Sequence, residues 1–150
     1  MAFNLLKIFF LSMLPLTELR GSIPLAYGLY GLNPVWVYVA AVLGNMVPVF
    51  FVWIFLEKLS GWFMKRSRLI EKILLFVFDR ARKKFYQQHK KFGDIALMLF
   101  VAIPLPVTGA WTGAVAAWLF GIPYKKSIYL IFAGLLISGF IVSLLSYWAF

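Results

Sequence analysis

Two opposite charges stand two residues apart within an apolar N-terminal segment, at Glu18 and Arg20. Pro15 and Pro24 bracket them. A proline inside a helix removes a backbone donor and clashes with the preceding turn, so a straight helix through the charges is not expected. A charged side chain at the centre of a membrane helix costs about 2.5–3.5 kcal/mol. If the flanking segments lie in a membrane, these charges mark a functional site.

The two side chains suggest two kinds of chemistry. A carboxyl group within a membrane can take up and release a proton, which makes Glu18 a candidate proton carrier. The planar guanidinium of Arg20 suits a carboxylate or a phosphate, so it is a candidate for holding an anionic group. The competing hypothesis is structural. Residues two apart in an extended segment point the same way, so the charges could pair with each other or cap backbone groups of the hairpin.

A second segment, residues 104–113, combines prolines, threonines and glycines without any charge. Ser22 in the first segment and Thr108 in the second are expected just before short helices, where hydroxyl groups cap free backbone N–H groups. The N-termini of such helices favour anions. For Asn45, an interhelical hydrogen bond and a site-lining role are equally open. The predicted substrate- or ion-binding residues are Thr17, Glu18, Arg20, Ser22, Asn45, Thr108, Gly109 and Thr112.

The composition indicates a membrane protein. The 150 residues are 63% hydrophobic and 13% charged, whereas soluble domains average about 25% charged residues. The net charge is +10, and residues 57–94 hold eleven of the fifteen Lys and Arg residues. A basic block between apolar segments is typical of a cytoplasmic loop. Nucleic-acid binding is not expected, because no stacking motif or recognition helix accompanies the charge.

Residues that would support an enzyme or a metal site are scarce. The chain has no cysteine and one histidine, His89, which excludes disulfides, thiolate ligands and histidine clusters. No nucleophile–base pair or phosphate-binding loop is present. The sequence therefore predicts no catalytic residue, no metal and no cofactor. The N-terminus lacks a basic region and a cleavage site, so we expect it to belong to the mature protein.

The segments beside the charges are too short to cross a bilayer. As a helix, residues 2–14 would be about 20 Å long, against a hydrocarbon core of about 30 Å. Residues 25–32 are shorter still and lead into a turn at Pro34. These segments predict a re-entrant hairpin, whose irregular tip would need surrounding protein. Residues 34–56 carry no charge and predict a spanning helix, kinked near Asn45 and Pro48.

The basic block is expected to contain an amphipathic helix on the cytoplasmic membrane surface. A solvated connector is the alternative. The apolar positions at helical spacing are Ile70, Ile73, Leu74, Val77, Phe78, Ala81 and Phe85, and basic residues lie between them.

From residue 95 the pattern repeats with an offset of 89 residues. Pro15 then aligns with Pro104, and Pro34 with Pro123. Residues 127–150 form a second stretch without charge that is long enough to span.

These elements predict one all-α integral membrane domain over residues 1–150. Residues 2–56 and residues 95–150 are each expected to form a re-entrant hairpin followed by one transmembrane helix. The two halves form an inverted repeat, and the linker 57–94 joins them. Lys125 and Lys126 stand beside the second turn, while the first turn has no charge. This asymmetry favours the inverted arrangement over four spans with both turns outside.

Two stretches resemble a known family. Residues 18–25, ELRGSIPL, and 104–113, PLPVTGAWTG, are similar to the signature stretches of the putative small multidrug export family. That family looks like a distant relative of the DedA-like (VTT-domain) membrane proteins. The resemblance covers nearly the whole chain and implies hairpins packed tip to tip, with transport or lipid translocation as the activity. DedA-like proteins usually carry arginines in the second hairpin, and this chain has none there.

The leading hypothesis is a small, proton-coupled secondary transporter of an anionic molecule or a phosphate-bearing lipid, located in the cell membrane. One alternative is proton-coupled export of lipophilic cations or drugs. Another is a membrane-organising protein that acts through the basic helix and transports nothing. The expected partners are membrane lipids, an anionic substrate or proton, and a second copy. A homodimer is expected because two full spans leave little room for a sealed pathway.

Overall fold

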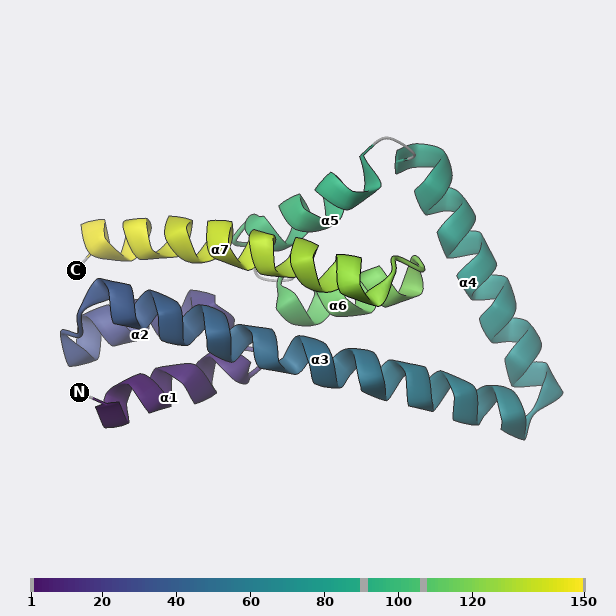
Figure 1. The fold of residues 1–150 in the computed structure, drawn as a ribbon, viewed down its shortest axis with the longest axis horizontal. Helices are drawn as coiled ribbons and strands as arrows, with labels where there is room; N and C mark the ends of the chain where they lie inside the picture. Colours follow the sequence, from purple (N-terminus) through teal and green to yellow (C-terminus); the bar gives the residue numbers. More distant parts are fainter. Residues whose placement is uncertain (1, 90–91, 106–107, 150) are drawn as a thin grey trace.

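The computed structural model describes residues 2–89, 92–105 and 108–149, without the side chains of residues 78, 81 and 84–89. Within these ranges it contains seven helices and no strand (Figure 1), which confirms the all-α prediction. The helices are α1 (Ala2–Met13), α2 (Glu18–Tyr30), α3 (Pro34–Arg66), α4 (Arg68–His89), α5 (Gly93–Ala102), α6 (Ala110–Leu119) and α7 (Tyr124–Ala149).

Two helical hairpins enter the molecule from opposite ends. Figure 1 shows α1 and α2 opening toward the end where both termini lie, whereas α5 and α6 open toward α4. The long helices α3 and α7 run beside them in opposite directions. Helix α1 packs on α3 and α5 packs on α7, while α2 contacts α7 and α6 contacts α3. The tips of the hairpins therefore meet between the two long helices.

A left-handed glycine separates each hairpin from the long helix that follows it. Gly31 ends α2 with a φ of 52°, and Gly121 follows α6 with a φ of 73°. A side chain in this conformation would be strained, which explains why glycine stands there. The Asn33 side chain then caps α3 by accepting the Val35 N–H at 3.0 Å. The turn predicted before Pro34 is thus present.

Glycines also allow both hairpins to touch their long helices closely. A Cβ at Gly44 of α3 would overlap the backbone of Phe9 in α1. A Cβ at Gly134 of α7 would lie 2.7 Å from the Met98 carbonyl oxygen in α5. Met98 follows Phe9 by 89 residues. Close packing through small residues is typical of membrane helices.

Helix α2 corrects the prediction for the first hairpin. The irregular segment was expected to reach Pro24, but it comprises only residues 14–17, and α2 begins at Glu18. Pro24 is the seventh residue of α2. One proline removes one helical hydrogen bond, while burial of Leu19, Ile23 and other side chains stabilises the remaining turns.

Helix α3 is longer than the predicted span. The sequence placed a boundary at residue 57, yet α3 continues for 33 residues to Arg66, and it stays helical through Asn45 and Pro48. The predicted boundary rested on the first charge, Glu57. A charged residue disfavours the membrane interior but does not disfavour a helix, so the charge and the helix end do not coincide.

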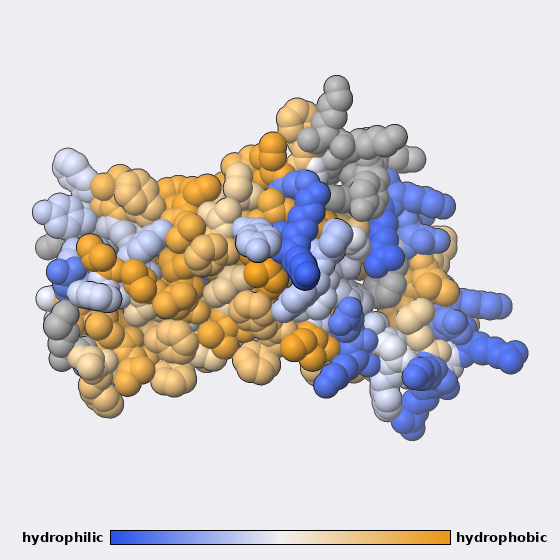
Figure 2. Space-filling view, in the orientation of Figure 1, coloured by the Kyte–Doolittle hydropathy of each residue, from blue (hydrophilic) through white to orange (hydrophobic). Residues whose placement is uncertain are grey.

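Apolar side chains cover most of the surface. Figure 2 shows hydrophobic residues over the body of the molecule and hydrophilic residues gathered at the α4 end. Helices α3 and α7 are each long and apolar enough to cross a membrane. Exposed apolar surface of this extent is typical of contact with lipid. The composition, the two helices and this surface indicate a membrane protein.

Helix α4 carries an apolar stripe that the rest of the described chain leaves exposed. The large exposed side chains on it are Leu69, Ile73, Leu75, Phe76 and Val77. Phe78, Ala81, Phe85 and His89, which the sequence analysis also considered, have side chains outside the described part. Attachment of α4 to the cytoplasmic membrane surface stays a prediction.

Candidate functional site

Glu18 is the first residue of α2 and lies at the tip of the first hairpin. Only 8% of its surface is exposed. Its φ of 44° lies in the left-handed region, where a residue with a side chain is strained by about 1–3 kcal/mol. Its backbone N–H donates to the Leu14 carbonyl at 2.9 Å. This tight turn directs the carboxylate toward the second hairpin.

The carboxylate of Glu18 occupies the N-terminus of α6. It lies beside the backbone N–H groups of Ala110 and Trp111, which interact favourably with its negative charge. Gly109, the N-cap residue of α6, touches the same carboxylate, because a Cβ at this position would overlap it. Helix N-termini bind anions through free N–H groups and the helix dipole. At this helix start, where the sequence predicted a site for a substrate anion, the structure places a carboxylate of the protein itself.

Arg20 binds the other half of the second hairpin. Its guanidinium donates to the carbonyl oxygens of Val101 at 3.3 Å and Ile103 at 3.1 Å, and also to that of Leu105. These carbonyls stand at the C-terminal end of α5, where a positive charge is favourable. The guanidinium predicted to hold a substrate anion thus holds backbone oxygens.

The expected local pair of Glu18 and Arg20 is not formed among the described residues. Its geometry assumed an extended tip, whereas residues two apart in a helical turn do not face each other. The other structural hypothesis, capping of hairpin backbone, agrees with the contacts. The two charges cap the backbone of the opposite hairpin, Glu18 at the start of α6 and Arg20 at the end of α5.

Two predicted site residues hold the first hairpin together. Ser22 was expected to cap a helix, but it lies inside α2 and shares a 2.6 Å hydrogen bond with Ser12 of α1. Ser12 also donates to the Ile8 carbonyl at 2.7 Å. Thr17 donates to the carbonyl of Leu11. These hydroxyl groups are engaged within the hairpin.

Both threonines of the second tip bond to backbone groups, and the one that caps α6 is not the predicted one. Thr108 precedes α6 as predicted, but its hydroxyl donates to the Ile103 carbonyl at 2.7 Å and so closes the turn after α5. Thr112 is the residue that caps the start of α6. Its hydroxyl accepts the Gly109 N–H at 3.0 Å.

Asn45 of α3 completes the site. It is fully buried, and its amide faces the Glu18 carboxylate. Neither Nδ2 nor Oδ1 has a partner at hydrogen-bond distance and angle. A buried polar group without a partner costs about 1–3 kcal/mol. Of the two roles left open by the sequence, this geometry favours lining the site.

Trp111, which is not among the predicted site residues, adds a further contact between the hairpins. Its indole Nε1 donates to the Met13 carbonyl at the end of α1, at 3.1 Å. Each hairpin therefore satisfies backbone groups at the tip of the other. The sequence signal for this contact was a tryptophan next to the start of a helix, because a buried indole N–H needs a hydrogen-bond acceptor.

Replacing Arg20 with lysine is expected to weaken the contact between the hairpins. Lysine lacks the planar fork that reaches several carbonyls, and a charge-assisted hydrogen bond contributes about 1.5–3 kcal/mol. Thermal unfolding in detergent should show a Tm lower by roughly 5 °C. Arg68→Lys, at the exposed start of α4, is the control and should leave the Tm unchanged. An unchanged Tm for Arg20→Lys would contradict the capping role.

Comparison with known families gives a match over most of the chain. Residues 18–141 match the family described as putative small multi-drug export protein. The match begins at Glu18, so it includes Glu18, Arg20 and the whole second hairpin but not residues 14–17 of the first tip. Neither the curated proteins nor the solved structures contain a significant match. Because the matched region covers well over half of the 150 residues, the chain belongs to the family of putative small multi-drug export proteins.

Proposed function

We propose that this protein is a small secondary transporter that couples proton movement to the transport of an anionic substrate. The observation that carries the proposal is the Glu18 carboxylate seated on the N-terminus of α6. The family description, an export protein, agrees with a transport role. In this proposal Glu18 is the proton carrier and α6 provides the anion site.

Proton binding and anion binding are coupled through a shared position. When Glu18 is ionised, its carboxylate fills the site formed by the Ala110 and Trp111 N–H groups. A protonated carboxyl has no charge and binds these groups more weakly, so an anionic substrate group can replace it. The positive charge of Arg20 interacts favourably with the ionised Glu18 carboxylate. The Asn45 amide offers a polar contact to whichever group fills the site, the carboxylate or the substrate anion. The proton and the anion then move together.

Equivalent features in the two halves support an inverted repeat. Gly31 and Gly121 close the two hairpins in the same left-handed conformation. Gly44 and Gly134, 90 positions apart, make similar close contacts, one with Phe9 and the other with Met98, which is 89 positions after Phe9. The two halves run in opposite directions (Figure 1). Transporters with inverted repeats place broken helices around a central site and expose it alternately to each side.

The proposed topology places residues 57–94 in the cytoplasm and both hairpins as re-entrant elements. Single cysteines at Tyr30 and Tyr124 test it, and the chain has no native cysteine to remove. A membrane-impermeant maleimide applied outside intact cells should label position 30 and leave position 124 unlabelled. Inside-out vesicles should give the reverse. A cysteine at Leu29, 70% exposed, is a second outer position. Labelling of both 30 and 124 from outside would support four spans.

The proposed cargo is a small anion or a phosphate-bearing lipid. Proteoliposomes with an imposed pH gradient test this with inorganic phosphate and with fluorescent phosphatidic acid as probes. Gradient-dependent movement of either probe is expected. The rival is a proton-coupled cation exporter. It would be supported if neither probe moves and if the protein transports ethidium instead. That ethidium transport should survive Arg20→Ala and be lost in Glu18→Gln. The family description favours testing that rival. The homodimer stays a prediction.

A further inference from the structure

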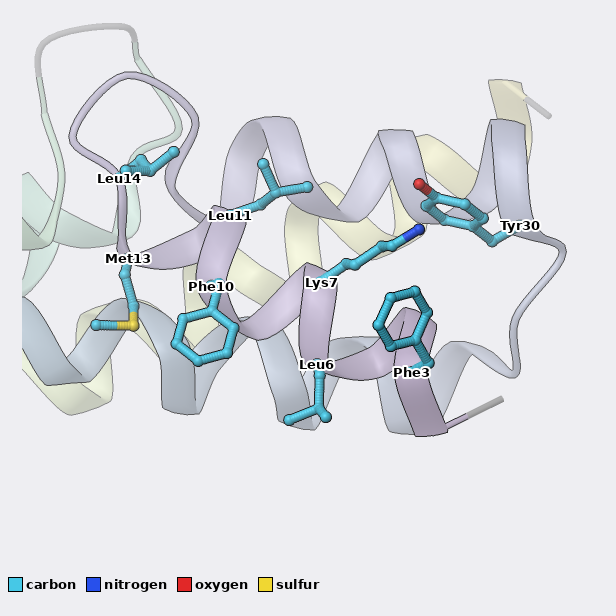
Figure 3. A pocket seen from close by; sticks show the side chains of 8 residues that line it. All are labelled: Phe3, Leu6, Lys7, Phe10, Leu11, Met13, Leu14 and Tyr30. Carbon is cyan, nitrogen blue, oxygen red and sulfur yellow. The ribbon is translucent and has the colours of Figure 1, made fainter.

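A groove runs along the outer face of α1, away from the site between the hairpins. Its volume is about 710 Å³, and apolar side chains line most of it, including Leu6, Phe10 and Leu14. Figure 3 shows the exception: the Lys7 side chain extends toward Tyr30, and its ammonium group lies between Tyr30 and Phe3. The groove is therefore apolar along most of its length and positively charged at one end.

Among the described residues, Lys7 is the basic side chain at this end of the molecule. Its ammonium lies 4.6 Å from the centre of the Phe3 ring and 5.6 Å from that of Tyr30. No carboxylate pairs with it among the described residues. Before the basic block the only other basic residue is Arg20, which binds backbone carbonyls of the second hairpin.

We propose that this groove binds one anionic phospholipid, with the phosphate at Lys7 and Tyr30 and an acyl chain along Leu6, Phe10 and Leu14. The dimensions fit one leaflet. From Phe3, whose ring the Lys7 ammonium contacts, to Met13 at the end of α1 the helix rises about 15 Å, and half of the hydrocarbon core is about 15 Å. Tyr30 is the last residue of α2, and a lysine ammonium beside its ring suits the headgroup level of a bilayer.

Charge argues against a second copy of the chain as the occupant. A protein surface over the groove would have to supply an acid for Lys7. Outside residues 57–94 the chain has one acid, Glu18, which is buried at the hairpin tips. A two-fold contact would also bring a second Lys7 near the first. A lipid phosphate supplies the missing negative charge, and the bound lipid need not be the transported substrate.

Photo-crosslinking in nanodiscs tests the proposal. Phosphatidylglycerol with a diazirine in the acyl chain should label Leu6, Phe10 and Leu14, as mapped by mass spectrometry. Phosphatidylcholine and diacylglycerol carrying the same chain should label these positions about fivefold less, because one lysine contributes about 1 kcal/mol to anionic lipid binding. Lys7→Gln should lower phosphatidylglycerol labelling to the phosphatidylcholine level. Lys125→Gln, an exposed lysine at the start of α7, should leave it unchanged.

Three outcomes would overturn the proposal. The first is equal labelling in Lys7→Gln and in the unaltered protein. The second is equal labelling by phosphatidylglycerol and diacylglycerol, which would mean that the groove contacts acyl chains without regard to charge. The third is absence of lipid labels at all three residues.

Discussion

Replacing Glu18 with glutamine is expected to lower the proton-driven accumulation of substrate in proteoliposomes by at least about tenfold. Glutamine keeps the size of the side chain but cannot bind and release a proton as a carboxyl group does. It therefore resembles the protonated carboxyl permanently. Without an ionised carboxylate to compete at the N-terminus of α6, substrate binding is no longer linked to proton binding.

The same variant should retain downhill exchange of the substrate. The anion site at α6 remains, and the neutral side chain competes with the substrate less than a carboxylate does. Accumulation against a gradient and exchange without one therefore separate in Glu18→Gln. Both are measured with the probe that the unaltered protein moves. Glu57→Gln, an exposed acid on α3, is the matched control and should behave as the unaltered protein. Accumulation that persists in Glu18→Gln would refute the proton role.

Replacing Gly109 with alanine is expected to separate the two hairpin tips. The added Cβ would overlap the Glu18 carboxylate, so either the carboxylate leaves the N-terminus of α6 or α6 moves. Overpacking of this kind costs about 1–3 kcal/mol. The Tm in detergent should fall, and transport should fall with it. Gly61→Ala is the matched control, because no atom lies within 4 Å of the Cβ it would add in α3.

A double-mutant cycle tests the cause of this loss. If the damage comes from contact with the carboxylate, Glu18→Ala should reduce the cost of Gly109→Ala, because the added methyl group then has room. The two effects on Tm would be less than additive, as expected for residues in contact. Additive effects, or a Gly109→Ala variant as stable as the unaltered protein, would contradict the close contact between Gly109 and Glu18.

The helical membrane character could be predicted because it depends on local properties. Long stretches without charge predicted two spanning helices, and α3 and α7 are long and apolar enough for that role. Glycine and proline predicted the turn before Pro34, which needs a left-handed residue at Gly31. Helix ends were less certain. Glu57 and Pro24 were treated as boundaries, but neighbouring turns and buried contacts kept α3 and α2 helical beyond those signals.

The candidate site was only partly accessible from the sequence. Glu18 and Arg20 stood out because a charge in an apolar segment is costly. Their partners did not, because these are backbone groups, and every residue carries the same N–H and C=O groups. Which of those groups are free depends on where α5 ends and α6 begins. Which of them meet the charges depends on contacts across more than 80 residues of chain, such as the pair Arg20 and Val101.

The sequence by itself thus determined an all-α membrane protein with one charged tip and one uncharged tip. The tertiary structure decided what the charges do. It places the anion of one hairpin on the free N–H groups of the other and the cation on its free carbonyls. The physical reason is that a helix leaves free N–H groups at its start and free carbonyl groups at its end, and these need partners where they are buried. The residues that satisfy them are fixed only when the two hairpins pack together.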